Sequence, residues 1–273
     1  MESSPRPAPF WRKLLFLPRE GSARVLAPWA KAFNWMAAFV LITLFFAVTF
    51  WRLEQGEWLW GAIWKYRALF ITGFEVTVII SIVSLVLSTL IGFIMALAGR
   101  SSFLLLRYLV KIYVEGVRGT PLLSQILIFF YVFAPAFHVT DRYVVGVLTL
   151  SFFAGAYISE IIRAGIESIP KSQIESARAI GLTRVQTYRF VIFPQALRQS
   201  LPPLAGQFVS LIKDSSLLSF ISVNEFTKNA QQVNSITYST LECYLLLAVG
   251  YLCLTLPISL WTRWLETRNK FDT

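Results

Sequence analysis

The chain has 273 residues, of which 56% are hydrophobic and only 15% are charged. Soluble domains carry about a quarter charged residues, so this composition excludes an ordinary soluble protein. The apolar residues gather in long uncharged runs, which are typical of membrane-spanning helices. The sequence therefore predicts an all-α, polytopic membrane protein with about six transmembrane helices.

The net charge of +10 does not indicate a nucleic-acid partner. The basic residues lie at the ends of many apolar segments and form no compact basic arm, which fits a membrane protein better. The cysteines, Cys243 and Cys253, lie in an apolar run without metal-ligand spacing, and the single histidine, His138, cannot form a metal cluster alone. We expect no metal and no cofactor.

The first apolar run lies at 35–51, with tryptophans at its margins, and basic residues precede it. This distance from the N-terminus is too long for a cleavable signal. We interpret residues 1–30 as a basic cytoplasmic tail and residues 31–69 as a transmembrane helix followed by an outer loop.

Five further spans are predicted along the rest of the chain. They lie at 77–98, 114–133, 144–162, 201–223 and 241–261. The second span carries one face of small and polar residues, namely Thr77, Ser81, Ser84, Ser88 and Gly92. Such a face favours close helix packing in lipid over the alternative, a pore lining. In the third span, Pro121 either kinks the helix or frees carbonyls near Val117 to face a cavity.

The distribution of lysine and arginine predicts the orientation. With the N-terminus inside, the cytoplasmic segments collect most of the positive residues, and only Arg52, Lys65, Arg67, Arg142 and Lys228 remain outside. This asymmetry favours two cytoplasmic termini and places the polar loop 163–200 in the cytoplasm.

That loop contains two helix-start signals separated by a glycine. Ser172 with Glu175 and Thr183 with Gln186 each have the spacing of a capping box. Gly181 can stop the first helix in a left-handed conformation, and Pro194 ends or bends the second. We expect a helix–glycine–helix unit on the cytoplasmic face.

The residues of this unit resemble a known motif. Glu175, Ser176, Ala177, Gly181 and the run Val191-Ile192-Phe193-Pro194 are similar to the EAA loop of ABC-importer permeases. The match departs at Ser176, where alanine is usual, and at Phe193, where leucine is common. The resemblance implies that residues 170–194, here called the coupling segment, dock into a cleft on an ABC ATPase subunit.

Three further stretches narrow the resemblance to polar amino acid permeases of the histidine, glutamine and glutamate type. They are residues 113–123, 155–165 and 211–217, and the similarity extends over about residues 70–270. It implies a five-helix permease domain at 70–273, preceded by one added helix. It also implies ABC ATPase subunits and an extracytoplasmic amino-acid-binding protein. Because one chain is small for a gated path, we expect a second permease copy or a paralogue.

Charged residues inside predicted spans are candidates for contacting the cargo. Lys213 and Asp214 point about 100° apart on a helix, so they could meet the carboxylate and the ammonium group of a zwitterion. Ser215 and Ser216 could add hydroxyl contacts. The alternative is that each charge pairs with a neighbouring helix, for instance with Glu115 or Arg118.

Further candidates for the substrate path lie beside the proline and in the fourth span. They are Arg118, Thr120 and Glu160. Glu160 has the spacing of an ordinary ion pair with Arg163, which favours gating or structure over direct contact with cargo.

The sequence contains no glycine-rich nucleotide loop, so a partner must supply ATP hydrolysis, and the chain itself is not expected to be an enzyme. A secondary transporter is disfavoured, because neither clear repeats nor a chain of intramembrane acids is visible. An intramembrane enzyme would need catalytic groups that the spans lack. A membrane scaffold stays open, since only a transport assay separates it from a permease.

Overall fold

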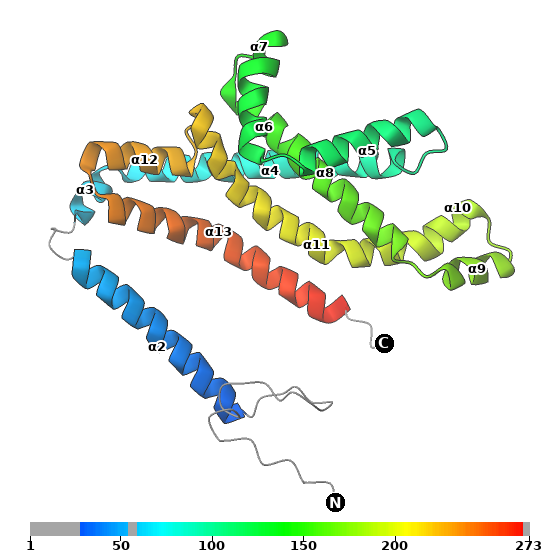
Figure 1. Ribbon diagram of the computed structural model, residues 1–273, viewed down its shortest axis with the longest axis horizontal. Helices are drawn as coiled ribbons and strands as arrows, with labels where there is room; N and C mark the ends of the chain where they lie inside the picture. The colour runs from blue at the N-terminus through cyan, green and yellow to red at the C-terminus, as the bar shows by residue number, and fades with distance from the viewer. Residues whose placement is uncertain (1–27, 54–58, 270–273) are drawn as a thin grey trace, which may run out of the picture. The chain divides into compact units, whose positions relative to one another are not determined.

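The computed structural model describes residues 28–53 and 59–269, and every regular element in these ranges is helical (Figure 1). The chain divides into two compact units, Met1–Trp58 and Leu59–Thr273. Most of the predicted basic tail, residues 1–27, lies outside the described residues.

The first unit contains helix α2, Pro28–Leu53, which includes the predicted span 35–51. Its 26 residues correspond to about 39 Å. From Phe39 to Phe46 its large apolar side chains are exposed. A helix that is apolar around its circumference suits surroundings of lipid.

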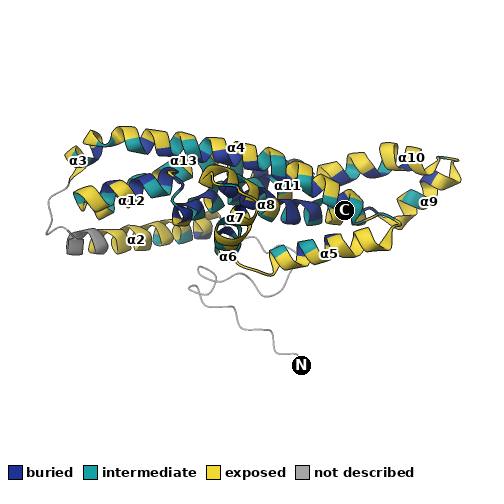
Figure 2. Ribbon diagram, turned by 90° about the horizontal axis from the view of Figure 1, so that it is seen from above, coloured by how far each residue is buried: buried dark blue, intermediate teal, exposed yellow. Residues whose placement is uncertain are grey.

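The second unit contains the remaining helices. They are α3 (Trp60–Lys65), α4 (Arg67–Ala98), α5 (Leu104–Arg118), α6 (Leu122–Ile128), the π-helical turn η1 (Phe129–Phe133), α7 (Ala134–Ala136), α8 (Arg142–Glu167), α9 (Lys171–Ala179), α10 (Arg184–Thr187), the π-helical turn η2 (Tyr188–Ile192), α11 (Phe193–Asp214), the 3-10 helix η3 (Ser215–Ile221), α12 (Phe226–Thr237) and α13 (Thr240–Asn269). Buried positions concentrate where α4, α8 and α11 meet, whereas α9 and α10 are mostly exposed (Figure 2).

Helices α4 and α8 make the most extensive contact in the unit, and the small residues of α4 explain their close approach. All five members of the predicted small face, Thr77, Ser81, Ser84, Ser88 and Gly92, are buried. A side chain at Gly92 would place its Cβ 2.5 Å from Cγ2 of Ile158 and 3.0 Å from the carbonyl oxygen of Gly155. The predicted packing role of this face is confirmed.

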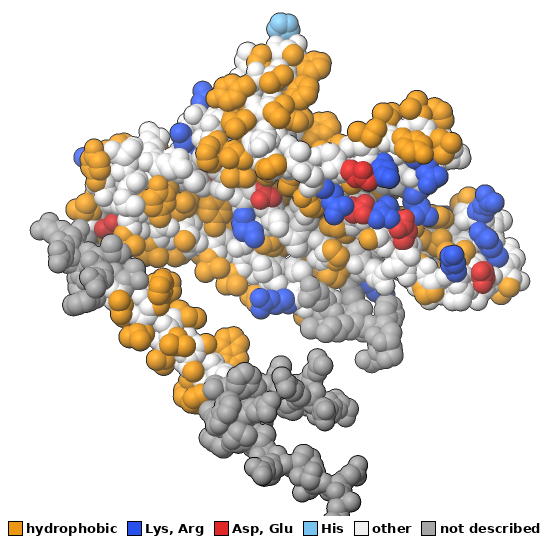
Figure 3. Space-filling view, in the orientation of Figure 1, with side chains coloured by type: hydrophobic (Ala, Val, Ile, Leu, Met, Phe, Trp, Pro, Cys, Tyr) orange, Lys and Arg blue, Asp and Glu red, His pale blue; other side chains and the backbone are white. Residues whose placement is uncertain are grey.

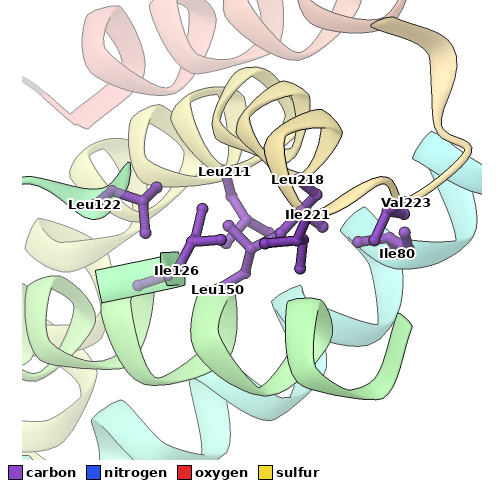
Figure 4. Close-up of a cluster of buried hydrophobic side chains, with 9 residues drawn as sticks. Ile80, Leu122, Ile126, Leu150, Leu211, Leu218, Ile221 and Val223 are labelled. Atoms are coloured by element: carbon purple, nitrogen blue, oxygen red, sulfur yellow. The ribbon is translucent and has the colours of Figure 1, made fainter. Parts of the chain in front are cut away.

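An apolar core beside this contact joins five helical elements, including η3. Its side chains come from α4, α6, α8, α11 and the segment after α11, and they point toward one another (Figure 4). Leu150 and Leu218 are fully buried in it, as is Ile126. Burial of each such side chain contributes about 1.5–3 kcal/mol, so this core fixes α6 and η3 against the bundle.

The third predicted span is broken. Helix α5 ends at Arg118, α6 begins at Leu122, and the two halves bend by 109°. The prediction of one continuous span at 114–133 was therefore wrong. The helix breaks here because Pro121 has no N–H to donate and disfavours a helical backbone conformation at the residue before it. The Val117 carbonyl is not free either, since it accepts a 2.7 Å hydrogen bond from Nε2 of Gln125.

By length and apolar composition, four helices of the described residues could cross a membrane. They comprise Pro28–Val48, Arg67–Ala98, Arg142–Glu167 and Thr240–Leu265, and the bent pair Leu104–Arg118 with Leu122–Ala136 adds a fifth if it forms one span. The predicted span 201–223 coincides with α11 and η3. The polar residues of α11 keep that helix out of this group.

Helix α12 was not predicted, since its residues were assigned to an outer loop. It packs against α4 and α13. The N–H of Phe226 donates a 3.0 Å hydrogen bond to Oγ1 of Thr77, and Nδ2 of Asn229 donates to the Leu69 carbonyl at 2.8 Å. These bonds fasten α12 to the first half of α4.

Candidate functional site

The first half of the coupling segment forms α9, which starts without a side-chain cap. Its N-cap is Pro170, and Ser172 is the second residue of the helix. A capping hydroxyl must precede the first helical residue to reach the free N–H groups, so Ser172 is too far along. The predicted capping box of Ser172 and Glu175 was wrong.

The turn after α9 has the predicted geometry. Gly181 adopts a φ of 85°, a left-handed conformation that favours glycine. The N–H of Gly181 donates to the Arg178 carbonyl at 2.9 Å, and that of Leu182 donates to the Ala177 carbonyl at 3.1 Å. These bonds satisfy carbonyls at the end of α9 and fix the direction of the chain.

The second capping box is present. The N–H of Gln186 donates to Oγ1 of Thr183 at 3.3 Å, and the N–H of Thr183 donates to Oε1 of Gln186 at 2.9 Å. Both bonds hold the start of α10 against the turn at Gly181. The predicted helix–glycine–helix unit is therefore formed.

Pro194 does not end the second helix. Helix α10 continues through η2 into α11, and Pro194 lies in the first turn of α11. The N–H of Phe193 bonds to the Tyr188 carbonyl five residues earlier, which gives the π-helical turn. This π-helical turn lies immediately before Pro194, which has no N–H to continue the α-helical hydrogen bonds, and the helical run still passes from the coupling segment directly into α11.

The coupling segment presents an apolar surface. Ile180 is 78% exposed and Val185 is 77% exposed, on either side of the Gly181 turn. Between α9 and η2 a shallow groove of about 390 Å³ is lined by Ser172, Gln173, Ser176, Ala177, Ile180, Leu182 and Val191. Large apolar side chains exposed together at a loop tip are suited to contact with a protein partner.

A larger cavity of about 550 Å³ lies between the end of α4, α5 and α8. It is lined by Met95, Ala96, Gly99, Leu104, Arg107, Tyr108, Val110, Lys111, Val114, Glu115, Arg118, Ser159, Glu160 and Arg163. Figure 3 shows basic and acidic side chains gathered over this region of α5 and α8. The cavity brings together Arg118 and Glu160, which the sequence had nominated separately.

Ion pairs connect the bend at α5–α6 to α8. Nη1 of Arg118 lies 3.6 Å from Oε1 of Glu160, and the Arg118 guanidinium lies 5.3 Å from the ring centre of Tyr157. Arg163 pairs with Glu160, as predicted, and with Glu167. The chain of charges runs along α8 from the bend to the residue that ends α8, shortly before α9.

Lys213 and Asp214 lie elsewhere, at the end of α11. Neither makes a hydrogen bond or ion pair with another helix in the part of the chain that the structure describes. The partners that would have neutralised them are engaged: Glu115 lies 3.7 Å from Lys111, and Arg118 pairs with Glu160. The alternative prediction, that Glu115 or Arg118 pairs with Lys213 or Asp214, is therefore wrong.

The remaining polar candidates bond to the backbone. Oγ of Ser215 donates to the Ile212 carbonyl at 2.7 Å, and Ser215 is buried while Ser216 is half-buried. Oγ1 of Thr120 donates to the Gly116 carbonyl at 2.9 Å and contacts Nε2 of Gln125 at 2.8 Å. Thr120 therefore supports the bend. Of these hydroxyl groups, that of Ser216, beside Lys213 and Asp214, has no hydrogen-bond partner among the described residues.

Sequence reasoning missed a buried carboxylate, Glu225. It is fully buried and caps α12 by accepting from the N–H groups of Thr227 at 2.8 Å and Lys228 at 2.7 Å. The Tyr251 hydroxyl donates to it at 3.0 Å. Glutamate is not a usual N-cap residue, so no sequence signal marked it. Among the described residues no group of three potential metal ligands occurs.

The sequence is similar to a family of transport proteins and to individual members of it. The family model of the "binding-protein-dependent transport system inner membrane component" matches residues 88–271. The glutamine transport system permease protein GlnP of Escherichia coli K12 is 36% identical over 213 residues, covering 77% of this chain and 97% of the relative. The L-cystine transport system permease protein TcyB of Bacillus subtilis is 46% identical over 164 residues, covering 60% of this chain and 70% of the relative.

The fold is also similar to solved structures of ABC transporters. The crystal structure of an amino acid ABC transporter with histidines matches with a TM-score of 0.72 and 33% identity, covering 78% of this chain and 99% of that one. An inward-facing MetNI methionine ABC transporter matches with a TM-score of 0.62 at 17% identity, covering 75% and 98%. The second match indicates the fold alone.

Proposed function

The chain belongs to the family of binding-protein-dependent transport system inner membrane components, and from this premise we propose how it imports polar amino acids. It is the permease subunit of an ABC transporter in the inner membrane, and its homologues are amino-acid permeases.

The coupling segment is the proposed contact with ABC ATPase subunits. The observation that carries this is the helix–glycine–helix geometry, in which the Gly181 turn and the Thr183 cap hold Ile180 and Val185 exposed at the tip. Because α10 continues through η2 into α11, a displacement of the tip moves the helix that carries Lys213 and Asp214. A docked ATPase has a cleft that alternates between two shapes. Each shape of the cleft would thus favour one of two arrangements of the transport path.

The proposed orientation puts both termini and the coupling segment in the cytoplasm. Lysine and arginine are concentrated in the tail, in the α4–α5 turn with the following half of α5 (Arg100, Arg107 and Lys111), and in loop 163–200. This is the positive-inside pattern. It places α12 and the α3–α4 junction on the outer side, where an extracytoplasmic amino-acid-binding protein would dock.

The proposed path for cargo runs beside Lys213 and Asp214. A carboxylate would meet Lys213, an ammonium group would meet Asp214, and Ser216 would offer a hydroxyl. Among the described residues, neither charge pairs with a residue of another helix. This supports the proposed role, because unpaired charges in a membrane protein are usually retained for function. Arg118 and Glu160 form an ion pair that holds the end of α5 against α8, and they do not contact the cargo.

A second permease copy or a paralogue completes the path. The arm formed by α6, η1 and α7 projects away from the bundle (Figure 1). Its side chains Tyr131, Val132, Phe133 and Phe137 are exposed. A partner subunit would cover these apolar side chains.

The proposal is tested by ATP hydrolysis in proteoliposomes that contain this chain with an ATPase subunit. A binding protein loaded with each amino acid in turn is added outside. We expect stimulation by one loaded protein, together with accumulation of its amino acid inside. If an intact complex shows neither stimulation nor accumulation with any amino acid, the chain is a scaffold or another kind of carrier.

A further inference from the structure

We propose that the cavity between α4, α5 and α8 binds the phosphate of an anionic phospholipid headgroup through Arg107 and Lys111. This inference depends on the inner-membrane location and on the proposed cytoplasmic placement of the α4–α5 turn. It does not depend on which cargo is carried.

The cavity carries an excess of positive charge. Four of its lining residues are basic, Arg107, Lys111, Arg118 and Arg163, and two are acidic, Glu115 and Glu160. Arg118 and Arg163 are engaged by Glu160 and Glu167. Lys111 has only a 3.7 Å contact with Glu115, in which both side chains are about two-thirds exposed. Such an exposed pair is weak, so Lys111 can accept a stronger partner.

Arg107 and Lys111 are like charges that repel each other on one face of α5. They are four residues apart on α5 and both line the cavity, which places like charges on the same helix face. Arg107 makes no ion pair among the described residues. An anion between the two side chains would convert this repulsion into two charge-assisted contacts.

The opposite face of α5 is apolar and exposed. Leu105, Leu109 and Ile112 recur at helical spacing on this face, and all three are exposed. Leu104 and Tyr108, which are also exposed, line the cavity edge between the apolar and charged faces. Helix α5 runs alongside α4 (Figures 1 and 2), so its apolar side can face acyl chains while the long basic side chains of its other face extend toward headgroup depth.

These features favour a lipid over a free anion. A headgroup phosphate would meet Arg107 and Lys111 while its acyl chains pass over Leu104 and Tyr108 toward the apolar face. A free phosphate would use the charges and leave the apolar edge uncovered. Basic pockets between membrane helices on the cytoplasmic side are suited to anionic headgroups.

The test uses the full chain with its ATPase partner in phosphatidylcholine nanodiscs. Spin-labelled phosphatidylglycerol and spin-labelled phosphatidylcholine are added separately, and the fraction of each that is immobilised gives a selectivity ratio. We expect the native chain to prefer phosphatidylglycerol. Arg107→Gln and Lys111→Gln should each lower the ratio about fivefold, and Arg107→Lys with Lys111→Arg should retain it.

Arg100→Gln is the matched control, because Arg100 is exposed in the α4–α5 turn but does not line the cavity. It should leave the ratio nearly unchanged. Equal immobilisation of both lipids by the native chain would overturn the proposal, as would equal losses for Arg100→Gln and Arg107→Gln. Loss of selectivity in millimolar inorganic phosphate, but not in the same ionic strength of chloride, would assign the cavity to free phosphate. Failure of uptake in the proteoliposome assay, with intact lipid selectivity in nanodiscs, would instead count against the proposed function.

Discussion

Nη1 of Arg118 lies 3.6 Å from Oε1 of Glu160, joining the last residue of α5, which precedes the bend, to α8. The Glu160 carboxylate also accepts a 3.0 Å hydrogen bond from Nε of Arg163. Glu160 is therefore shared by two arginines, whereas Arg163 has a second acceptor in Glu167. The loss of Glu160 therefore breaks two ion pairs, whereas the loss of Arg118 breaks only one.

Glu160→Gln should destabilise the protein more than Arg118→Gln. The neutral amide leaves Arg118 without its acidic partner and leaves Arg163 with Glu167 alone. Because these side chains are partly exposed, the Arg118–Glu160 coupling in a double-mutant cycle should be about 1 kcal/mol or less. Thermal unfolding of the detergent-solubilised chain measures all three variants, and a larger loss for Arg118→Gln would contradict the shared-carboxylate arrangement.

Thr183→Ala should weaken the start of α10, whereas Ser172→Ala should have little effect. Only Thr183 accepts a capping hydrogen bond, and its loss costs about 1 kcal/mol. Hydrogen exchange of the Gln186 amide measures the local opening, and stimulation of the ATPase measures its consequence. Equal exchange in the two variants would show that the cap does not order the coupling segment.

Lys213→Met and Asp214→Asn should reduce uptake while leaving stability nearly unchanged. Neither charge has a partner on another helix in the described chain, so substitution orphans no group and should change stability by less than about 0.5 kcal/mol. Loss of a charged hydrogen bond to cargo corresponds to roughly ten- to hundredfold weaker transport at low substrate concentration. Uptake kinetics and thermal unfolding are measured together.

Arg100→Met is the control for these two variants, since it removes an exposed positive charge of the α4–α5 turn that makes no ion pair among the described residues. It should retain uptake. A large loss of stability in Lys213→Met or Asp214→Asn would instead indicate that these charges pair within the assembled protein.

Glu225→Ala should destabilise the protein strongly. The substitution removes the acceptor for two backbone N–H groups and for the Tyr251 hydroxyl, all in a buried setting. The expected loss is about 2–4 kcal/mol, and Tyr251→Phe, which removes one of these bonds, should lose about 1 kcal/mol. Thermal unfolding would contradict this network if both variants matched the native chain.

The sequence predicted the packing face of α4 and the Gly181 turn well, because both depend on local residue types. Small residues at helical spacing admit a close neighbour, and a glycine between two helices readily adopts positive φ. The Thr183 cap was equally local. Each of these features required only the residues within one or two turns of helix.

Features that depend on tertiary contacts were not predictable. Pro121 indicated a kink, but the 109° bend depends on the Gln125 amide, which satisfies the Val117 carbonyl, and on the core that holds α6. The Ser172–Glu175 spacing suggested a cap that the actual helix start at Lys171 excludes. Helix α12 depends on Glu225 and on Thr77, which lie far apart in the sequence.

The central claim is that the coupling segment transmits ATPase motion to the path, and Gly181→Ala tests it most directly. Its Cβ would meet open space, so the substitution acts only through the strained positive φ, at a cost of about 1–2 kcal/mol. Gly61→Ala, also in open space but without positive φ, is the control. The measurement is the number of amino acids accumulated per ATP hydrolysed in the same proteoliposomes. The account predicts that this ratio falls in Gly181→Ala and not in Gly61→Ala. An unchanged ratio in Gly181→Ala, with the complex intact, would contradict it.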